Sequence, residues 1–192
     1  MFESLTLDGY FTGKDGDLSW SHGPAQQDPE WMEFVSGNAS GGGALLFGRV
    51  TFEMMRSFWP TPQAAKDMPK VAKAMNEMPK FVVSKTLKQP DWQNTTILSG
   101  DLVEDVMRLK ASDGPNLTIL GSGRVVSRLA ATGLVDSYQF VLIPVAIGVG
   151  RPLFEDMHQP LALQRVDSRS FRNGNVVVTY APEPAAVAGP RS

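Results

Sequence analysis

Three short segments of the sequence combine the residue types that bind phosphate groups in proteins. They are Gly48-Arg49-Val50-Thr51, Ser84-Lys85-Thr86 and Gly121-Ser122-Gly123-Arg124-Val125. The planar fork of an arginine grips phosphate oxygens with two donors. A glycine turn before a helix presents free N–H groups and the positive end of the helix dipole. Two arginines, a lysine and several hydroxyls suit a pyrophosphate with one further phosphate, which favours NADP over NAD.

Each of these signals has a plainer interpretation when it is taken alone. Gly121-Ser122-Gly123 also fits an ordinary strand-to-helix turn whose glycines permit close packing, because it lacks the full dinucleotide fingerprint and its downstream acidic residue. A single arginine is more often a solvated surface charge than a ligand-binding group. The set is therefore informative only if the three segments meet in space.

The elements around these segments predict that they do meet. Each segment follows an apolar run typical of a buried strand, at residues 44–47, 81–83 and 117–120. A further strand is expected at 95–98, and helical patterns alternate with the strands at 52–59, 102–110 and 125–131. Such alternation predicts right-handed crossovers and a largely parallel sheet, whose strands end at one edge.

The two ends of the chain depart from this alternation. Residues 138–145, 161–171 and 176–180 have strand character, and Asn173-Gly174 is a strong hairpin signal. Residues 148–152 are expected to form a loop. Residues 2–7 predict a clipped first strand, followed by a turn-rich loop that reaches Trp20. The prediction is an α/β fold with a mostly parallel sheet and antiparallel C-terminal strands.

The first helix has a clear predicted start. Asp28 is an N-cap candidate, Pro29 suits the first helical position, and Glu30 adds a negative charge to the first turn. Trp31 and Phe34 then fall on one face of the helix. Residues 36–43 hold four glycines and are expected to end it.

The composition narrows the class of protein. With 192 residues, 42% hydrophobic and 20% charged residues and a net charge of -2, the chain suits one globular domain without a basic stripe for nucleic acid. The absence of cysteine and the presence of only two histidines argue against a metal site. No membrane span or signal peptide is apparent, so a cytoplasmic location is expected. Residues 1–181 are predicted to form the domain, and residues 182–192 a disordered tail.

Further short motifs occur along the chain in a specific order. They are Leu5-Thr6-Leu7-Asp8-Gly9-Tyr10, Gly48-Arg49-x-Thr51, Val83-Ser84-Lys85-Thr86, Leu120-Gly121-Ser122-Gly123, Leu134-Val135-Asp136 and Pro144-x-x-x-Gly148-x-Gly150-x-Pro152-Leu153-Phe154. With them the chain, up to about Tyr180, resembles the dihydrofolate reductase-like superfamily. The likeness is strongest to the C-terminal reductase domain of riboflavin-biosynthesis deaminase-reductases and its stand-alone relatives. It implies a three-layer fold, with helices on both faces of the sheet, and an NADPH-dependent reductase.

The resemblance also implies a role for each phosphate-binding segment. Arg49 and Thr51 would lie at the cofactor phosphates, and Gly121, Ser122 and Gly123 at the pyrophosphate. Ser84 and Lys85, with Arg124, would lie near the adenosine 2′-phosphate. Gly48, Thr86 and Val125 complete the predicted cofactor-binding set.

On the substrate side the resemblance points to the first helix. Dihydrofolate reductases carry a carboxylate there that binds the pterin and assists its protonation, then an apolar residue and, four positions on, an aromatic one. Glu30, Trp31 and Phe34 reproduce that spacing and are the predicted catalytic and substrate-binding residues. The alternatives are that Glu30 only complements the helix dipole, that Asp28 or Glu33 is the relevant acid, and that the aromatic residues are plain core.

The predicted function is reduction of a small pterin-like, pyrimidine-like or carbonyl compound with NADPH. The alternative is a non-catalytic nucleotide-binding or regulatory module with the same fold. The zinc-binding deaminase domain of the riboflavin-pathway enzymes has no counterpart in this sequence, so the substrate stays open. The resemblance also suggests a homodimer, with the strands at 141–145 and 176–180 offering edges or faces to a partner. No nucleic-acid, membrane or metal partner is expected.

Overall fold

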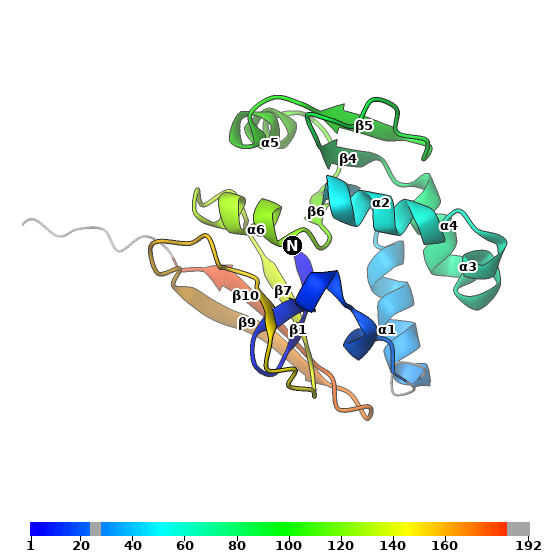
Figure 1. Ribbon diagram of the computed structural model, residues 1–192, viewed down its shortest axis with the longest axis vertical. Coiled ribbons are helices and arrows are strands. Elements are labelled where there is room, and N and C mark those ends of the chain that lie inside the picture. The colour runs from blue at the N-terminus through cyan, green and yellow to red at the C-terminus, as the bar shows by residue number, and fades with distance from the viewer. Residues whose placement is uncertain (24–27, 184–192) are drawn as a thin grey trace, which may run out of the picture.

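A mixed sheet runs through the centre of the protein and is built from two four-stranded parts (Figure 1). The computed structural model describes residues 1–23 and 28–183. The first part contains, in spatial order, β5 (Thr95–Leu98), β4 (Lys80–Val83), β3 (Ala44–Gly48) and β6 (Leu117–Ile119). The second contains β1 (Phe2–Thr6), β7 (Tyr138–Ile143), β10 (Val176–Pro182) and β9 (Leu163–Ser170).

The two parts form one continuous sheet. A parallel bridge between Phe2 and Leu120 joins the start of β1 to the residue that follows β6. The strands of the first part pair in parallel, as do β1 and β7. β10 runs antiparallel to both of its neighbours, β7 and β9. The predicted mostly parallel sheet with antiparallel C-terminal pairing is confirmed, and β10 is the strand that reverses direction.

Helices cover both faces of this sheet and complete three layers. On one face lie α1 (Pro29–Ser40), α2 (Arg49–Phe58) and α4 (Pro69–Glu77), with the short α3 (Pro62–Asp67) packed on α4. On the other face lie α5 (Leu102–Ala111) and α6 (Gly123–Ala130). Figure 1 shows α1 and α4 beside each other, away from α5 and α6.

Successive side chains of the buried strands point to opposite faces of the sheet, and each face packs against one of the two helix layers. Leu45 and Phe47 of β3 point into a core that contains Phe52 of α2. Leu46, between them, points into a second core that contains Val126 of α6. A parallel strand buried on both faces is apolar at every position, which explains the continuous run from Ala44 to Phe47 in the sequence.

The structure corrects three expectations about the elements. α1 does not end at Ser36 but continues to Ser40, because Val35 and Ala39 pack into the core beside α2 and α4 and outweigh the cost of about 1 kcal/mol for a glycine in a helix. α3 was not expected; Thr61 caps it, and its first residue is a proline. The predicted loops at 8–20 and 148–152 contain a two-stranded ribbon, β2 (Tyr10–Gly13) with β8 (Gly150–Pro152), and two short 3₁₀ turns (Lys14–Gly16 and Ser19–Ser21).

The C-terminal hairpin forms where the sequence places it. Gly174 adopts a φ of +88° and donates its N–H to the carbonyl of Phe171. β10 extends to Pro182, and the N–H of Glu183 bonds to the carbonyl of Ala162, so ordered pairing passes the predicted boundary at residue 181. The remainder of the predicted tail, residues 184–192, lies outside the described residues.

A buried lysine ties α4 to the first part of the sheet. Lys80 opens β4 and is completely buried, and its Nζ donates to the carbonyls of Met75, Asn76 and Met78 at 2.6–3.0 Å. The same Nζ lies 4.6 Å from the centre of the Trp92 ring. Burial lowers the pKa of Lys80 to about 8. The end of α4 and the start of β4 are thereby held together.

Candidate functional site

The three predicted phosphate-binding segments lie at one edge of the sheet. β4, β3 and β6 are neighbours and parallel, with Gly48 opposite Val83 and Leu46 opposite Ile119. Their carboxyl ends therefore meet, as the alternation of strands and helices predicts. A ligand role for these residues stays a prediction at this point.

Two of the segments are joined by hydrogen bonds. Ser122 Oγ accepts the N–H of Gly48 at 2.6 Å and donates to Thr51 Oγ1 at 2.9 Å. Gly121 has a φ of +61°, and a Cβ on it would lie 2.9 Å from Thr51 Cγ2. Ser122 is also left-handed, at φ 73°. The Gly-Ser-Gly turn thus needs its glycine both for backbone conformation and for close approach to α2.

The contact between Gly48 and Ser122 lies at a switch in the strand order. From β3 the chain moves outward to β4 through helices on one face, and then to β5 through the irregular residues 84–94. It returns through α5 on the other face to β6, on the opposite side of β3. In open α/β sheets a crevice forms at the carboxyl ends of the two strands flanking such a switch, and ligands bind there. This edge is therefore the favoured ligand position on the sheet.

α2 and α6 both begin at this crevice, and the backbone N–H groups of their first turns are donors there. Their N-cap residues, Gly48 and Ser122, make no side-chain capping bond within the described part of the chain. The first N–H groups of a helix have no intrahelical partner. Arg49 pairs with Glu53 one turn along α2, at 2.9 Å, and both side chains are roughly half exposed. Arg124 lies on the exposed face of α6, where its charge acts on Glu155.

The second segment borders a hollow of about 340 Å³ at the ends of β4 and β5. Ser84 is buried, and its Oγ accepts the N–H groups of Thr86 and Leu87, so it shapes the turn. Lys85 is exposed and lines the hollow, together with Arg128 of α6 and Asp101 at the start of α5. Arg128 was not predicted; its spacing of one helical turn from Arg124 is the signal that would have found it.

The ribbon of β2 and β8 covers the start of α6. A Cβ on Gly123 would lie 2.4 Å from Phe11 Cζ, so the Phe11 ring rests directly on the first residue of the helix. The guanidinium carbon of Arg151, in β8, lies over the same ring, 5.7 Å from its centre. The Asp8 carboxylate accepts the N–H groups of Ile147 and Gly148, which joins two of the sequence motifs that carried the resemblance.

Glu30 is not brought to this crevice. Its carboxylate lies 3.1 Å from the guanidinium of Arg169, and both side chains are partly exposed. Arg169 belongs to β9, the edge strand, which is three strands from β1 in the sheet order. Asp28 caps α1 by accepting the N–H of Trp31, as predicted. The described contacts of Glu30 therefore fit its alternative interpretation, a charge at the helix start.

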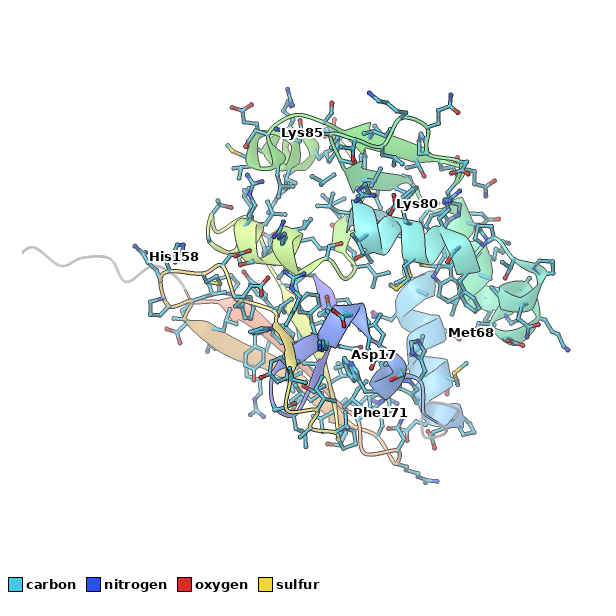
Figure 2. The ribbon with its side chains drawn as sticks, viewed as in Figure 1. Asp17, Met68, Lys80, Lys85, His158 and Phe171 are labelled. Atoms are coloured by element: carbon cyan, nitrogen blue, oxygen red, sulfur yellow. The ribbon has the colours of Figure 1, made fainter. Side chains whose placement is uncertain are left out.

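Trp31 and Phe34 belong to an aromatic cluster beneath α1. Trp31 is buried, and its ring lies 5.5 Å from that of Phe34 and 5.1 Å from that of Phe171. Phe34 also lines a shallow hollow of about 510 Å³ between α1 and β9, together with Glu33 and Arg169. Lys85 and Phe171 lie near opposite ends of the molecule in Figure 2. The predicted substrate residues and the predicted phosphate residues thus lie in different regions.

Sequence reasoning missed a buried carboxyl on β1. Glu3 follows Phe2, the residue that bridges to the end of β6. Its Oε2 is buried without a hydrogen-bond partner among the described residues, and its Oε1 accepts the N–H of Ser4. Burial raises the pKa of Glu3 to about 8, so this carboxyl is protonated at neutral pH. No local pattern marks it, because the burial comes from neighbouring strands.

The residues at the crevice fit a dinucleotide phosphate. Two helix starts without capping side chains suit a pyrophosphate, and the closeness of Gly121 to Thr51 shows why backbone rather than a side chain forms the floor there. Lys85 and Arg128 add positive charge at one end of the crevice. Among the described residues, no group of three or more His, Asp or Glu side chains could hold a metal ion.

A comparison with protein families is consistent with this geometry. The RibD C-terminal domain model matches residues 1–177. The chain belongs to the RibD C-terminal domain family. The match spans nearly all of the chain, so every strand that forms the crevice lies within it.

Related proteins and structures agree with membership of the RibD C-terminal domain family. The uncharacterized protein YyaP of Bacillus subtilis is 27% identical over 179 residues, which cover 92% of this chain and 90% of YyaP. A crystal structure of a putative riboflavin biosynthesis protein from Shewanella sp. PV-4 has a TM-score of 0.73 and 26% identity, covering 95% of this chain and 97% of that chain.

A dihydrofolate reductase of Enterococcus faecalis, complexed with NADP(H) and RAB-propyl, has a TM-score of 0.64 and 17% identity. The match covers 95% of both chains. At this identity the likeness shows the fold, and the dihydrofolate reductase-like architecture is confirmed. The match to the RibD C-terminal domain family is the finding that supports a reductase-like role. In the part of the chain that the structure describes, no helix has the length and apolar character needed to cross a membrane.

Proposed function

We propose that this protein is an NADPH-dependent reductase of a small pterin-like, pyrimidine-like or carbonyl compound. The observation that supports this most is the meeting of Gly48, Thr51 and Ser122 at the switch between β3 and β6. Two helix starts without side-chain caps face that point, and the family is one of reductases. Fold alone does not carry an activity, so the proposal rests on this arrangement of groups.

The order of the strands supports one orientation for a bound cofactor along this edge of the sheet. The helix starts of α2 and α6 would hold its phosphates, and Lys85 marks the adenosine end beside β4. The other end would then reach β6 and β1. NADPH supplies the hydride when it is bound, while the protein binds, orients and excludes water. Phe11 rests on Gly123 and would shield the phosphates at the start of α6 from solvent.

Two carboxyls are candidates for donating the proton that accompanies the hydride. Glu30 is the candidate predicted from the sequence, and Glu3 is the candidate that lies on β1 beside the end of β6. A positioned acid typically contributes a factor of 10² to 10⁴ in rate. Glu30→Gln and Glu3→Gln are matched variants. The one that lowers turnover by about 100-fold or more, while NADPH affinity is retained, identifies the donor.

The central experiment is titration of the protein with NADPH and with NADH by calorimetry. We expect NADPH to bind about tenfold or more tightly, because a charge-assisted contact to the 2′-phosphate contributes roughly 1.5–3 kcal/mol. Equal affinity would contradict the 2′-phosphate assignment. Dihydropterins, pyrimidine ribityl compounds and simple carbonyls should then be screened for loss of NADPH absorbance. Tight NADPH binding without any turnover would instead support the non-catalytic binding module.

The homodimer that the resemblance suggests stays a proposal, but its expected edges need correction. Residues 141–143 lie in β7 and residues 176–180 in β10, and both of these strands are paired on two sides. Among the described strands of the central sheet, β9 and β5 lie at its two ends, and the side chains of β9 are largely exposed. Light scattering that shows a monomer at high concentration would exclude the dimer.

A further inference from the structure

The hollow at the ends of β4 and β5 contains three charged side chains of opposite sign. Lys85 and Arg128 bring positive charge, and Asp101 brings negative charge. Its volume of about 340 Å³ is in the range of small-molecule sites. Ser84 and Gly100 supply polar backbone and hydroxyl groups around them. The hollow is therefore shaped for a ligand group that is small, polar and charged.

Asp101 has two separate roles in this hollow. Its Oδ1 accepts the N–H groups of Val103 and Glu104 and so caps α5. Its Oδ2 lies 3.5 Å from Nη2 of Arg128. The pKa of Asp101 is held below its usual range, chiefly by the two N–H donors and to a smaller extent by Arg128. The carboxylate is thus held as an anion by the start of α5, and it lies at the limit of hydrogen-bond distance from one nitrogen of the guanidinium.

Arg128 rather than Arg124 has the geometry to bind a phosphate beside Lys85. Arg128 lines the hollow with Lys85, whereas Arg124 lies one turn earlier on α6, where its charge acts on Glu155. Asp101 lines the same hollow and lies 3.5 Å from Arg128, so a phosphate bound to Arg128 in the hollow would lie near the carboxylate. The phosphate and the carboxylate repel each other, while a ribose hydroxyl in the same place would donate a hydrogen bond to the carboxylate.

We propose that Arg128 binds the adenosine 2′-phosphate of the cofactor, and that Asp101 competes with this phosphate for Arg128 and so limits the preference for NADPH over NADH. This inference rests on the proposed function, because it assumes that the cofactor binds at this edge. It adds two residues that the sequence did not assign, and it replaces Arg124 with Arg128 as the arginine of the phosphate. Asp101 acts as a specificity-determining residue.

Asp101→Asn tests the competition without removing the helix cap. Asparagine is as good an N-cap as aspartate, so the variant should melt within about 2 °C of the wild type. We expect its affinity for NADPH to rise about tenfold in calorimetric titration, and its affinity for NADH to change less than about twofold. Adenosine 2′,5′-bisphosphate, which carries the 2′-phosphate but no nicotinamide, should gain affinity in parallel with NADPH. If Asp101→Asn does not fold, Asp101→Ser keeps a capping oxygen and serves the same test.

Arg128→Gln is the complementary variant. It should lower NADPH affinity about tenfold and leave NADH affinity within about twofold. In the double variant, Asp101→Asn should raise NADPH affinity by less than it does in the wild type, because the competition for Arg128 is lost and only the direct repulsion between carboxylate and phosphate remains to be relieved. Asp167→Asn and Arg165→Gln, on the distant strand β9, are controls for net charge and should change neither affinity.

The outcomes separate this inference from the proposed function. If the wild type binds NADPH but Asp101→Asn raises NADPH and NADH affinity equally, or changes neither, the competition is refuted and the proposed function stands. If Arg128→Gln leaves NADPH affinity unchanged, the assignment of the phosphate to Arg128 is refuted. If the wild type binds neither NADPH nor NADH at millimolar concentration, the inference and the proposed function are refuted together.

Discussion

The helices that begin beside the two parts of the sheet differ in whether side chains of the protein satisfy their first turn. In the part from β5 to β6, α2 and α6 begin on Gly48 and Ser122 without a side-chain cap, and polar groups gather at the strand ends. Beside the part from β1 to β9, both acidic side chains at the start of α1 have partners within the protein. Asp28 caps the helix, and Glu30 pairs with Arg169. A residue type at the start of a helix therefore indicates a ligand site only when nothing in the protein already satisfies it.

The largest effect in this comparison is expected for Gly121→Ala. An alanine there would have an unfavourable positive φ and a Cβ 2.9 Å from Thr51 Cγ2. We expect the free energy of unfolding to fall by about 2–3 kcal/mol and NADPH affinity to fall about tenfold. Chemical denaturation and calorimetric titration measure the two quantities.

Gly133→Ala is the matched control for that variant. Gly133 also has a positive φ, of +71°, but a Cβ on it would have no atom within 4 Å. It should cost about 1–2 kcal/mol of stability and leave NADPH affinity unchanged. Equal losses in both variants would show that close approach of Gly121 to Thr51 is unimportant.

The second prediction concerns Glu3, on the β1 side of the comparison. Its pKa is about 8 in the folded protein and near 4.5 in the unfolded chain, so the folded state binds one more proton between these values. The contribution of Glu3 to the free energy of unfolding should therefore be most favourable below about pH 4.5, and should fall as the pH rises toward 8. We expect this group to lower the stability by roughly 2 kcal/mol between pH 6 and 8.

Glu3→Gln should remove that part of the pH dependence. Melting temperatures of the wild type and the variant at pH 5, 6, 7 and 8 measure the difference in slope, and groups common to both proteins cancel. The variant should gain stability relative to the wild type as the pH rises. A parallel pair of curves would mean that Glu3 is ionised normally.

The third prediction concerns Ser122, which joins the starts of α2 and α6 at the crevice. Ser122→Ala removes the acceptor of the Gly48 N–H and the donor to Thr51, so we expect a loss of about 1–2 kcal/mol. NADPH affinity should also fall, because the two helix starts lose their connection. Ser112→Ala, which removes only a local bond to the carbonyl of Leu109, should change neither quantity measurably.

The smallest effect is expected on the opposite side, at Asp28. Asp28→Ala removes the side-chain oxygen that accepts the Trp31 N–H and should cost about 1 kcal/mol, whereas Asp28→Asn should cost only a few tenths. Neither variant should alter NADPH affinity. A change in affinity from Asp28→Ala would contradict the separation of the two regions.

Much of the fold could be predicted because its signals are local. The strand from Ala44, the glycine turn at 121–123 and the cap at Asp28 depend on neighbours within one or two turns of chain, and all three occur as expected. The hairpin at Asn173-Gly174 is local in the same sense. Two of the failures depend on distant contacts: β8 exists because β2 pairs with it, and α1 continues to Ser40 because its last turn packs into the core. α3 was missed although its signals, the Thr61 cap and a proline at the first position, are local.

The sequence by itself determined the strand–turn–helix units and the chemical character of their ends, because period, glycine and capping patterns act over a few residues. The tertiary structure alone decided which ends meet. β6 lies beside β3 rather than β5, so Ser122 reaches Gly48 and Thr51. α1 turns Glu30 toward Arg169, and neighbouring strands bury Glu3. Each of these outcomes depends on which residues distant in sequence pack together, and that is set by the balance of the whole core rather than by any local pattern.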